Sequence, residues 1–261
     1  MSSDNSPGKP FRHRFIGGEL LIGTFMKTPA TQPVEVIGDV GFEFVVIDEE
    51  HAPWDRVTID AAILAARACG TAALVRVAEP TAAKILSVLD DGATGILVPH
   101  VSSAAKAKEI ADACRYRKGK RGFSNTTRAG RFGATAMWEH ADRSDDTVTA
   151  IAMIEDPEAL DEIDAIVATE GLDGFFIGRG DLTMAYGVAN ASAPEVRDAC
   201  DVILSAAKRV GKPVVVMVAN AEEAKGFQER GASAFIVASD QGFMRKAAAA
   251  AYSELAALGT K

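Results

Sequence analysis

Cysteines and long apolar stretches are both scarce in this chain, and each absence excludes a class of protein. The 261 residues include three cysteines, which lie far apart and form no Cys-x-x-Cys pair. A disulfide framework and a cysteine-bound zinc site are therefore not expected, and such thiols are typical of a reducing compartment. No apolar stretch approaches the roughly 18 residues that a membrane span requires. Because residues 1–10 are polar and lack the apolar centre of a signal peptide, we expect a cytoplasmic protein.

Basic residues are fewer than acidic residues in this chain. Lys and Arg number 28 against 36 Asp and Glu, a formal net charge of −8. This balance argues against nucleic acid or an anionic membrane as the main partner. The basic run from Arg115 to Arg121 is therefore interpreted as a solvated loop near an anionic substrate, with Arg121 approaching the site. The connection 115–149 that contains this run is long enough to be a functional or assembly element.

Eight short apolar segments alternate with amphipathic helical patterns along the chain. Nucleotide-binding glycine motifs are missing, and most of the segments are the continuous apolar runs of parallel strands buried on both faces. The pattern predicts an α/β fold, a (β/α)₈ TIM barrel, over residues 16–261, preceded by a flexible N-terminal segment, residues 1–15. The predicted strands are Leu20–Phe25, Phe44–Asp48, Ala72–Val77, Gly95–Val98, Ala150–Glu155, Gly174–Ile177, Pro213–Val218 and Ala234–Ala238.

Several of the predicted helices begin at a recognisable cap. Asp156 precedes a proline, Ser102 or Ser103 precedes an alanine-rich segment, and Asn220 precedes another. Such residues accept hydrogen bonds from the free amides of a first helical turn. The helices expected after these caps, and the last helix of the chain, cover residues 104–115, 158–168, 221–230 and 245–258.

Polar residues follow four of the predicted strands at the ends that form the mouth of a barrel. The second strand ends in Asp48-Glu49-Glu50-His51, the third carries Arg76, the fifth ends in Glu155 and the sixth precedes Arg179-Gly180-Asp181. Barrel enzymes place their catalytic residues at this mouth. We therefore expect a histidine, an arginine and two carboxylates to form one site.

Glu155 and Asp181 are the candidate metal ligands. Two carboxylates leave most of an octahedral shell open for water and a chelating substrate, which suits Mg²⁺ or Mn²⁺, with Co²⁺ or Zn²⁺ possible. Alternatively, Glu155 only ends a strand and Asp181 only caps a helix. The company of Arg76 and His51 favours the metal site.

Arg76 and His51 are the candidate catalytic side chains. A guanidinium within an apolar strand needs an anion, and its fork suits a carboxylate or an enolate, although pairing with Asp48 or Glu50 could be only structural. A histidine beside three acids suits proton transfer near neutrality. Lys27, just past the first strand, is a poor candidate for an imine, so the sequence favours metal chemistry over Schiff-base chemistry.

The segments VVIDEEHAP, ALVRV, VLDDGATGILVPHV, KRGF, AMIE and FFIGRGDL resemble, in their order and spacing, the HpcH/HpaI family of class II pyruvate aldolases. The resemblance covers nearly the whole chain from about Leu20. It implies a hexamer with active sites near subunit boundaries. Arg179 stands where the family usually has proline, and a basic group there could favour an acidic or phosphorylated aldehyde.

The resemblance also implies a role for each site residue. Glu155 and Asp181 would bind the metal, and Arg76 would stabilise the enolate oxygen. His51 would transfer protons, helped by Asp48 and by Asp90 as its acidic partner. The backbone amides of Gly180 and Asp181 would receive the substrate carboxylate, with Gly180 permitting close approach.

The predicted function is a metal-dependent carbon–carbon lyase, an aldolase that cleaves 4-hydroxy-2-keto acids reversibly to pyruvate and an aldehyde. Substrates of this kind include 2-keto-3-deoxy sugar acids and 4-hydroxy-2-oxo-dicarboxylates. A coenzyme A thioester lyase of the citryl or malyl type is an alternative on the same barrel. A non-catalytic binding barrel is a more remote one.

Overall fold

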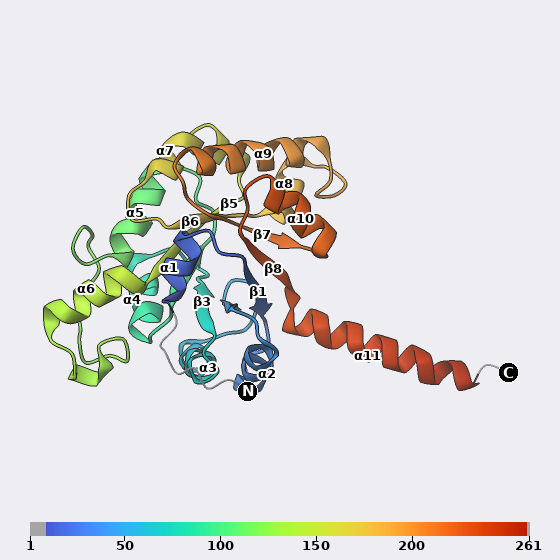
Figure 1. Ribbon diagram of the computed structural model, residues 1–261, viewed down its shortest axis with the longest axis horizontal. Coiled ribbons are helices and arrows are strands. Elements are labelled where there is room, and N and C mark those ends of the chain that lie inside the picture. Colours follow the sequence, from blue (N-terminus) through green and yellow to red (C-terminus); the bar gives the residue numbers. More distant parts are fainter. Residues whose placement is uncertain (1–8, 260–261) are drawn as a thin grey trace.

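The computed structural model describes residues 9–259 and forms a closed barrel of eight parallel strands in sequential order (Figure 1). The predicted (β/α)₈ barrel is confirmed, and every predicted strand overlaps an observed one. Three of them match residue for residue, because their apolar runs are bounded by polar residues or glycine. The strands are β1 Leu21–Met26, β2 Phe44–Asp48, β3 Ala72–Arg76, β4 Gly95–Val98, β5 Thr149–Ile154, β6 Gly174–Ile177, β7 Val214–Val218 and β8 Ala234–Ser239.

Two apolar layers hold the strands in place. Alternate side chains such as Leu21, Phe44 and Phe176 fill the inside of the barrel, and their neighbours pack outward against the helices. The helices are α1 Phe11–Ile16, α2 Thr31–Val40, α3 Arg56–Ala68, α4 Ala82–Asp90, α5 Ala104–Cys114, α6 Met137–Thr147, α7 Ile163–Ala168, α8 Arg179–Tyr186, α9 Pro194–Arg209, α10 Ala221–Glu229 and α11 Asp240–Ala256, with short 3₁₀ segments η1 Arg131–Gly133, η2 Pro157–Leu160 and η3 Ala257–Gly259.

Two of the predicted caps are confirmed and one is wrong. Ser103 and Asn220 accept hydrogen bonds from the first turns of α5 and α10. Asp156 stands at the N-cap position of η2, with Pro157 in the first turn, but its side chain makes no capping hydrogen bond, and the expected single helix is η2 followed by α7. Its carboxylate instead lies 3.0 Å from Nδ1 of His100.

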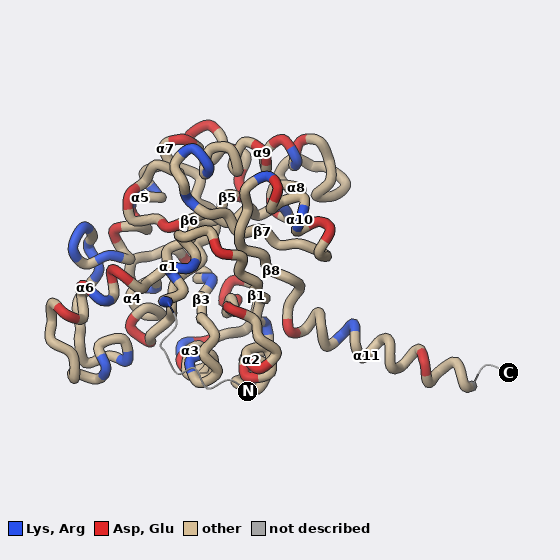
Figure 2. The backbone as a smooth tube through the Cα atoms, viewed as in Figure 1, with Lys and Arg blue, Asp and Glu red and all other residues tan. Residues whose placement is uncertain are grey.

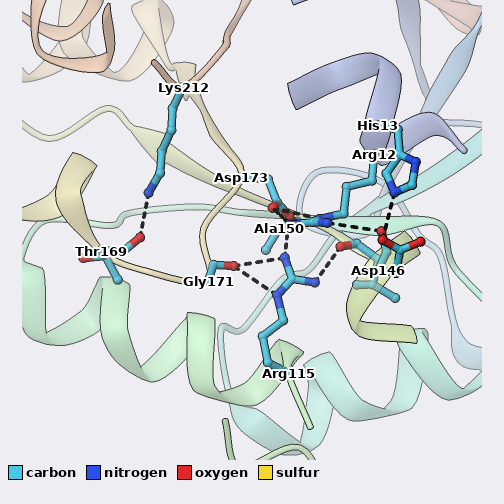
Figure 3. Close-up of polar contacts among 10 residues, drawn as sticks. Arg12, His13, Arg115, Asp146, Ala150, Thr169, Gly171, Asp173 and Lys212 are labelled. Carbon is cyan, nitrogen blue, oxygen red and sulfur yellow. Dashed lines mark hydrogen bonds and ion pairs between the residues drawn. The ribbon is translucent and has the colours of Figure 1, made fainter. Parts of the chain in front are cut away.

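Helix α1 closes the end of the barrel opposite the mouth. Phe11 and Phe15 are buried, so the prediction that residues up to 15 are flexible is wrong for α1; residues 1–8 of that segment lie outside the described residues. In Figure 3, Arg12 of α1 and Arg115 both reach the buried carboxylate of Asp173, which stands just before β6. This buried ion pair, with its hydrogen bonds, fixes α1 to the barrel.

The connection 115–149 contains η1 and α6, and its basic run is solvated only in part. Arg117, Lys118 and Lys120 are exposed, whereas Arg115 and Arg121 are buried. Arg121 donates to Ser144 Oγ at 2.8 Å and to Asp90 Oδ1 at 3.0 Å. Because α5 runs away from the mouth, the arginines that follow it lie at the opposite end, and the expectation that Arg121 approaches the site is wrong.

Helix α11 projects from the barrel instead of packing along it (Figure 1). Asp240, in its first turn, is buried and accepts hydrogen bonds from the amides of Lys27 and Thr28 at 2.7 and 3.0 Å. Beyond this anchor, large apolar side chains such as Met244 and Leu255 are exposed, and Figure 2 shows few charged residues along the helix. Within residues 9–259, no helix has the length and apolar character needed to cross a membrane.

Candidate active site

Two cavities of similar size lie at opposite ends of the barrel. The cavity away from the mouth has about 550 Å³, and its lining includes four arginines but no carboxylate. The mouth cavity has about 540 Å³ and is lined by residues that follow the strands, among them His51, Arg76 and Asp181. Only the mouth combines a carboxylate, a histidine and cations, so it is the candidate active site.

Asp48 and Arg76 form a buried pair at the ends of β2 and β3. The side chain of Asp48 is fully buried, and Oδ1 accepts from Nε of Arg76 at 2.8 Å. The other arm of Arg76 lies 3.3 Å from Glu50 Oε2. Although burial raises the pKa of Asp48, the charges of Arg76 and Lys27 outweigh it and hold the pKa below its usual range. The carboxylates orient the guanidinium, and a guanidinium has five N–H groups, so donors remain for a substrate oxygen.

His51 lies at the rim of the same cavity. Its backbone amide donates to Asp48 Oδ1 at 3.2 Å, which fixes the turn after β2. Its imidazole is about half exposed, and Nε2 lies 3.7 Å from Glu50 Oε2. The predicted grouping of His51 with Asp48 is therefore observed through the backbone, while the carboxylate beside the imidazole is that of Glu50.

Glu155 and Asp181 lie together on the other side of the mouth. Glu155 is buried, and Oε1 accepts a hydrogen bond from the amide of His100 at 2.7 Å. Gly178 is required here, since a Cβ on it would come within 2.4 Å of the Glu155 side chain. Burial raises the pKa of Glu155 to about 7, with the hydrogen bond from His100 opposing the shift and the charge of Asp181 adding to it.

This carboxylate pair fits a divalent cation. A buried carboxylate beside a second one is destabilised as an anion, and a cation between them would remove that penalty. Among the described residues, no three or more His, Cys, Asp or Glu side chains are grouped to hold a metal ion by themselves. Two oxygen ligands therefore suit an ion that fills its other positions with water and substrate, as Mg²⁺ does.

His100, which follows β4, is a further residue beside Glu155. It adopts a left-handed backbone conformation, with φ 54°, which turns its amide toward Glu155. Burial lowers its pKa, but the hydrogen bond to Asp156 and the charges of Glu155, Asp156 and Glu50 together raise it above the ordinary value. Only the fold brings these acids to His100, so no local pattern could have predicted the cluster.

The first turn of α8 faces the mouth through Gly180 and Asp181. The first amides of a helix have no carbonyl partner within it, so they can receive an anion. A Cβ on Gly180 would meet no protein atom within 4 Å, so the space beside this residue is open to the cavity. Close packing of protein atoms requires a glycine at Gly178 instead.

Arg179 lines the mouth cavity, but its guanidinium is already paired with other groups of the protein. Its guanidinium donates to Glu223 Oε1 at 2.6 Å and to the carbonyl of Met217 at 2.5 Å, and it stacks on Phe227. Met217 lies in β7, and Glu223 and Phe227 lie in α10, which follows it. The expectation that this arginine recognises an acidic aldehyde is therefore not supported by its contacts.

Asp90 is not part of the mouth of its own barrel. It is the last residue of α4, which runs from the end of β3 back to the start of β4, and it pairs with Arg121 at 3.0 Å. The prediction that Asp90 supports His51 is thus wrong within one chain. A sequence motif gives no warning of this, because a helical position reveals its end of the barrel only once the topology is known.

Comparison with known proteins agrees with the geometry. Residues 21–247 match the HpcH/HpaI aldolase/citrate lyase family. The chain belongs to this family. It is 34% identical, over 95% of its length and 96% of theirs, to proteins named 5-keto-4-deoxy-D-glucarate aldolase from Enterobacter sp. (strain 638) and Escherichia coli O6:H1.

Solved structures also superpose closely on the chain. The citrate synthase SbnG is 29% identical with a TM-score of 0.88, covering 97% of this chain and 99% of its own. A family member from Burkholderia cenocepacia is 25% identical with a TM-score of 0.88, covering 94% and 98%. The family generally depends on a divalent metal. Since the 34% identical relatives are aldolases, this HpcH/HpaI member is an aldolase, a carbon–carbon lyase.

Proposed function

We propose that this aldolase cleaves 4-hydroxy-2-keto acids derived from sugar acids to pyruvate and an aldehyde, with Mg²⁺ or Mn²⁺. The observation that carries the proposal is the carboxylate pair Glu155 and Asp181, of which Asp181 lines the mouth cavity together with Arg76. The relatives named for 5-keto-4-deoxy-D-glucarate support a sugar-acid substrate. A metal held by the two carboxylates would act as a Lewis acid on the 2-keto acid.

The protein side chains supply the remaining chemistry. In cleavage, a base removes the proton of the 4-hydroxyl, the bond between C3 and C4 breaks, and its electrons move to the C2 oxygen. Free N–H groups of Arg76 stabilise this enolate oxygen, while the first-turn amides of α8 bind the carboxylate. Proton return to C3 gives the methyl group of pyruvate. His51, oriented through Asp48 and facing Glu50, is the proton carrier.

Lys27 is not the nucleophile of an imine mechanism. An imine-forming lysine needs an apolar pocket or a neighbouring cation that favours the free amine. Nζ of Lys27 instead lies 3.0 Å from the carboxylate of Asp48. This contact supports the metal-dependent class.

The proposed state is a homo-oligomer in the cytoplasm, the hexamer that the family resemblance implies. The exposed apolar side chains of α11 support packing against another copy. Asp90 can act on His51 only across such a subunit boundary. The three cysteines are free, which suits a reducing compartment.

Exchange of the methyl protons of pyruvate in D₂O tests the half-reaction without knowledge of the aldehyde. We expect NMR to show exchange that depends on added Mg²⁺ or Mn²⁺ and stops with EDTA. Glu155→Gln and Arg76→Ala should each lower the rate by about 10²-fold or more, because each removes a group that stabilises the enolate. Glu158→Gln, an exposed neighbour, is the matched control and should exchange normally.

Two results would contradict the proposal. Undiminished exchange in Glu155→Gln would exclude this carboxylate from the site. No exchange by the wild-type enzyme with any metal would exclude the pyruvate enolate. Coenzyme A thioesters and citrate formation would then be assayed, since a citrate synthase shares the fold at 29% identity.

A further inference from the structure

The cavity at the end of the barrel opposite the mouth has no part in the chemistry described above. Its volume of about 550 Å³ lies within the range of small-molecule sites. Residues around the starts of β3, β4 and β5 line it, together with residues of α3 and α6. The lining includes Arg67, Arg128, Arg131 and Arg143 but no Asp or Glu. Clefts lined by charge of one sign concentrate ligands of the opposite sign, so this cavity favours an anion.

Three of the four arginines have no carboxylate partner. Arg128 pairs with Asp60 at 2.7 Å. Arg143 donates only to a backbone carbonyl, at 3.0 Å, which leaves its charge unbalanced. The guanidinium groups of Arg67 and Arg131 make no hydrogen bond or ion pair with any residue that the structure describes. Their planar forks are therefore available to an anion, and such forks match the oxygens of a phosphate group.

Arg131 stands on a turn with an unusual backbone conformation. Arg131 and Phe132 both have φ 56°, in the left-handed region, and Gly133 follows with φ 89°. Left-handed residues other than glycine cost free energy and cluster at ligand sites. The turn is held by the amides of Phe132 and Gly133, which donate to the carbonyls of Thr127 and Asn125 at 2.9 and 2.7 Å. The backbone that carries Arg131 is thus fixed beside the cavity.

His140 adds a buried donor that has no acceptor in the described part of the chain. It lines the cavity and is 1% exposed, and its Nδ1 makes no hydrogen bond there. Nε2 lies 3.4 Å from the hydroxyl of Tyr116. When this hydroxyl donates to Nε2, the hydrogen of the neutral ring is on Nδ1. The hydroxyl of Ser144, which also lines the cavity, accepts from Arg121 at 2.8 Å and keeps its own hydrogen for another acceptor. Because an unmade buried hydrogen bond costs free energy, a ligand oxygen would be stabilised here.

Another part of the wall is apolar. Phe11, Ile63 and Leu89 are buried and line the same cavity. A free phosphate ion would leave this surface uncovered, whereas a ligand with a planar or apolar body beside its anionic group would cover it. Phe11 belongs to α1, so such a ligand would touch the helix that closes this end of the barrel.

We propose that this cavity binds a small organic phosphate with a planar or apolar body, of the size of a nucleoside monophosphate. The phosphate group is held by Arg131 and Arg143 with the Nδ1–H of His140, and the body lies against the apolar wall. The site lies at the opposite end of the barrel from the mouth and does not depend on the proposed function. Because the ligand binds only the folded chain, it raises the stability of the protein by mass action.

Isothermal titration calorimetry with adenosine 5′-monophosphate, ribose 5-phosphate and adenosine tests the site. We expect the nucleotide to bind tightest, with one molecule per chain and a rise in Tm, and adenosine to bind weakest. Arg131→Met should raise the Kd of the nucleotide by about 10- to 100-fold, because hydrogen bonds to a charged group are lost. Arg131 is exposed, so this variant should fold normally. His140→Phe keeps a ring against Tyr116 and Phe123 but removes the N–H, and should raise the Kd by about 3- to 10-fold.

Two further variants are controls. Arg197→Met removes an exposed arginine of α9 that makes no side-chain ion pair with a described residue, and Arg76→Ala removes the arginine of the mouth. Both should bind the nucleotide as the wild type does. An equal loss of affinity in Arg197→Met would assign the effect to net charge and overturn the proposal. A loss in Arg76→Ala with none in Arg131→Met would place the nucleotide at the mouth. Adenosine that binds as tightly as the nucleotide would exclude recognition of the phosphate. Absence of binding by both phosphates would show that the cavity is closed or filled in the assembled protein, and the proposal would be wrong.

Discussion

His140, on α6, is a single residue through which the fold responds to pH. It is buried, its Nδ1 has no hydrogen-bond partner, and Nε2 lies 3.4 Å from the hydroxyl of Tyr116. Burial lowers its pKa, and the charges of Arg121 and Arg143 lower it further. The ring therefore stays neutral in the folded protein at pH values where the unfolded chain protonates it.

Linkage fixes the sign of the effect. The unfolded chain takes up a proton on His140 as the pH falls through 6.5, whereas the folded protein does so only at lower pH. Stability from this residue is thus fully present above pH 6.5 and is lost as the pH falls below it. We expect Tm to drop less between pH 7.5 and 5.5 in His140→Gln than in wild type, measured by differential scanning calorimetry. Parallel pH profiles would contradict this assignment.

The site residues divide into those that sequence could predict and those it could not. Asp48, Arg76 and Glu155 were predictable, because each is a charge at the end of a continuous apolar strand. His100 was not predictable, since its backbone turn follows from the assembled barrel. For the same reason the sequence could not show that Asp90, at the end of α4, lies away from the mouth of its own chain. Lys27 was read only as a poor imine candidate, because its contact with Asp48 of the next strand appears only once the two strands pair.

Among the elements, α1 shows how a short helix can be decisive. Six residues are too few for a stable isolated helix, so α1 forms because Phe11 and Phe15 pack against the barrel interior. Phe15→Ala should lower the free energy of unfolding by about 3–5 kcal/mol. Ile16→Ala, at an exposed neighbour, should cost far less. Equal midpoints in urea for the two variants would show that α1 does not close the barrel.

The same reasoning explains which elements were predictable. Strands were located well because burial on both faces leaves an apolar run in the sequence. The helix after Asp156 was not located well, because the Asp156 carboxylate contacts His100 and makes no capping hydrogen bond. α1 was missed because its helicity comes from packing, which local sequence does not record.

At the scale of the whole molecule, length and alternation predicted the barrel, but the direction of α11 could not be read from the sequence. Its cap is ordinary, with Ser239 accepting from the amide of Gly242, yet the helix leaves the barrel after its first turn (Figure 1). Met244 and Leu255 are 61% and 68% exposed. Since they are about three helical turns apart, they share one face, and a face of this kind is typical of a subunit contact.

Assembly through α11 predicts a change of mass when this face becomes charged. The double variant Met244→Glu/Leu255→Glu should reduce the oligomer to smaller species, because unpaired carboxylates would be buried in the contact. Val202→Glu, at a half-exposed position on α9, should keep the wild-type mass. Size-exclusion chromatography with light scattering measures both. Because Met244 and Leu255 are exposed in the single chain, the substitutions should leave the barrel folded, and circular dichroism of the double variant should match wild type. An unchanged oligomer would place the subunit contact elsewhere, and a monomeric wild type would exclude the proposed assembly and, with it, any role of Asp90 at His51.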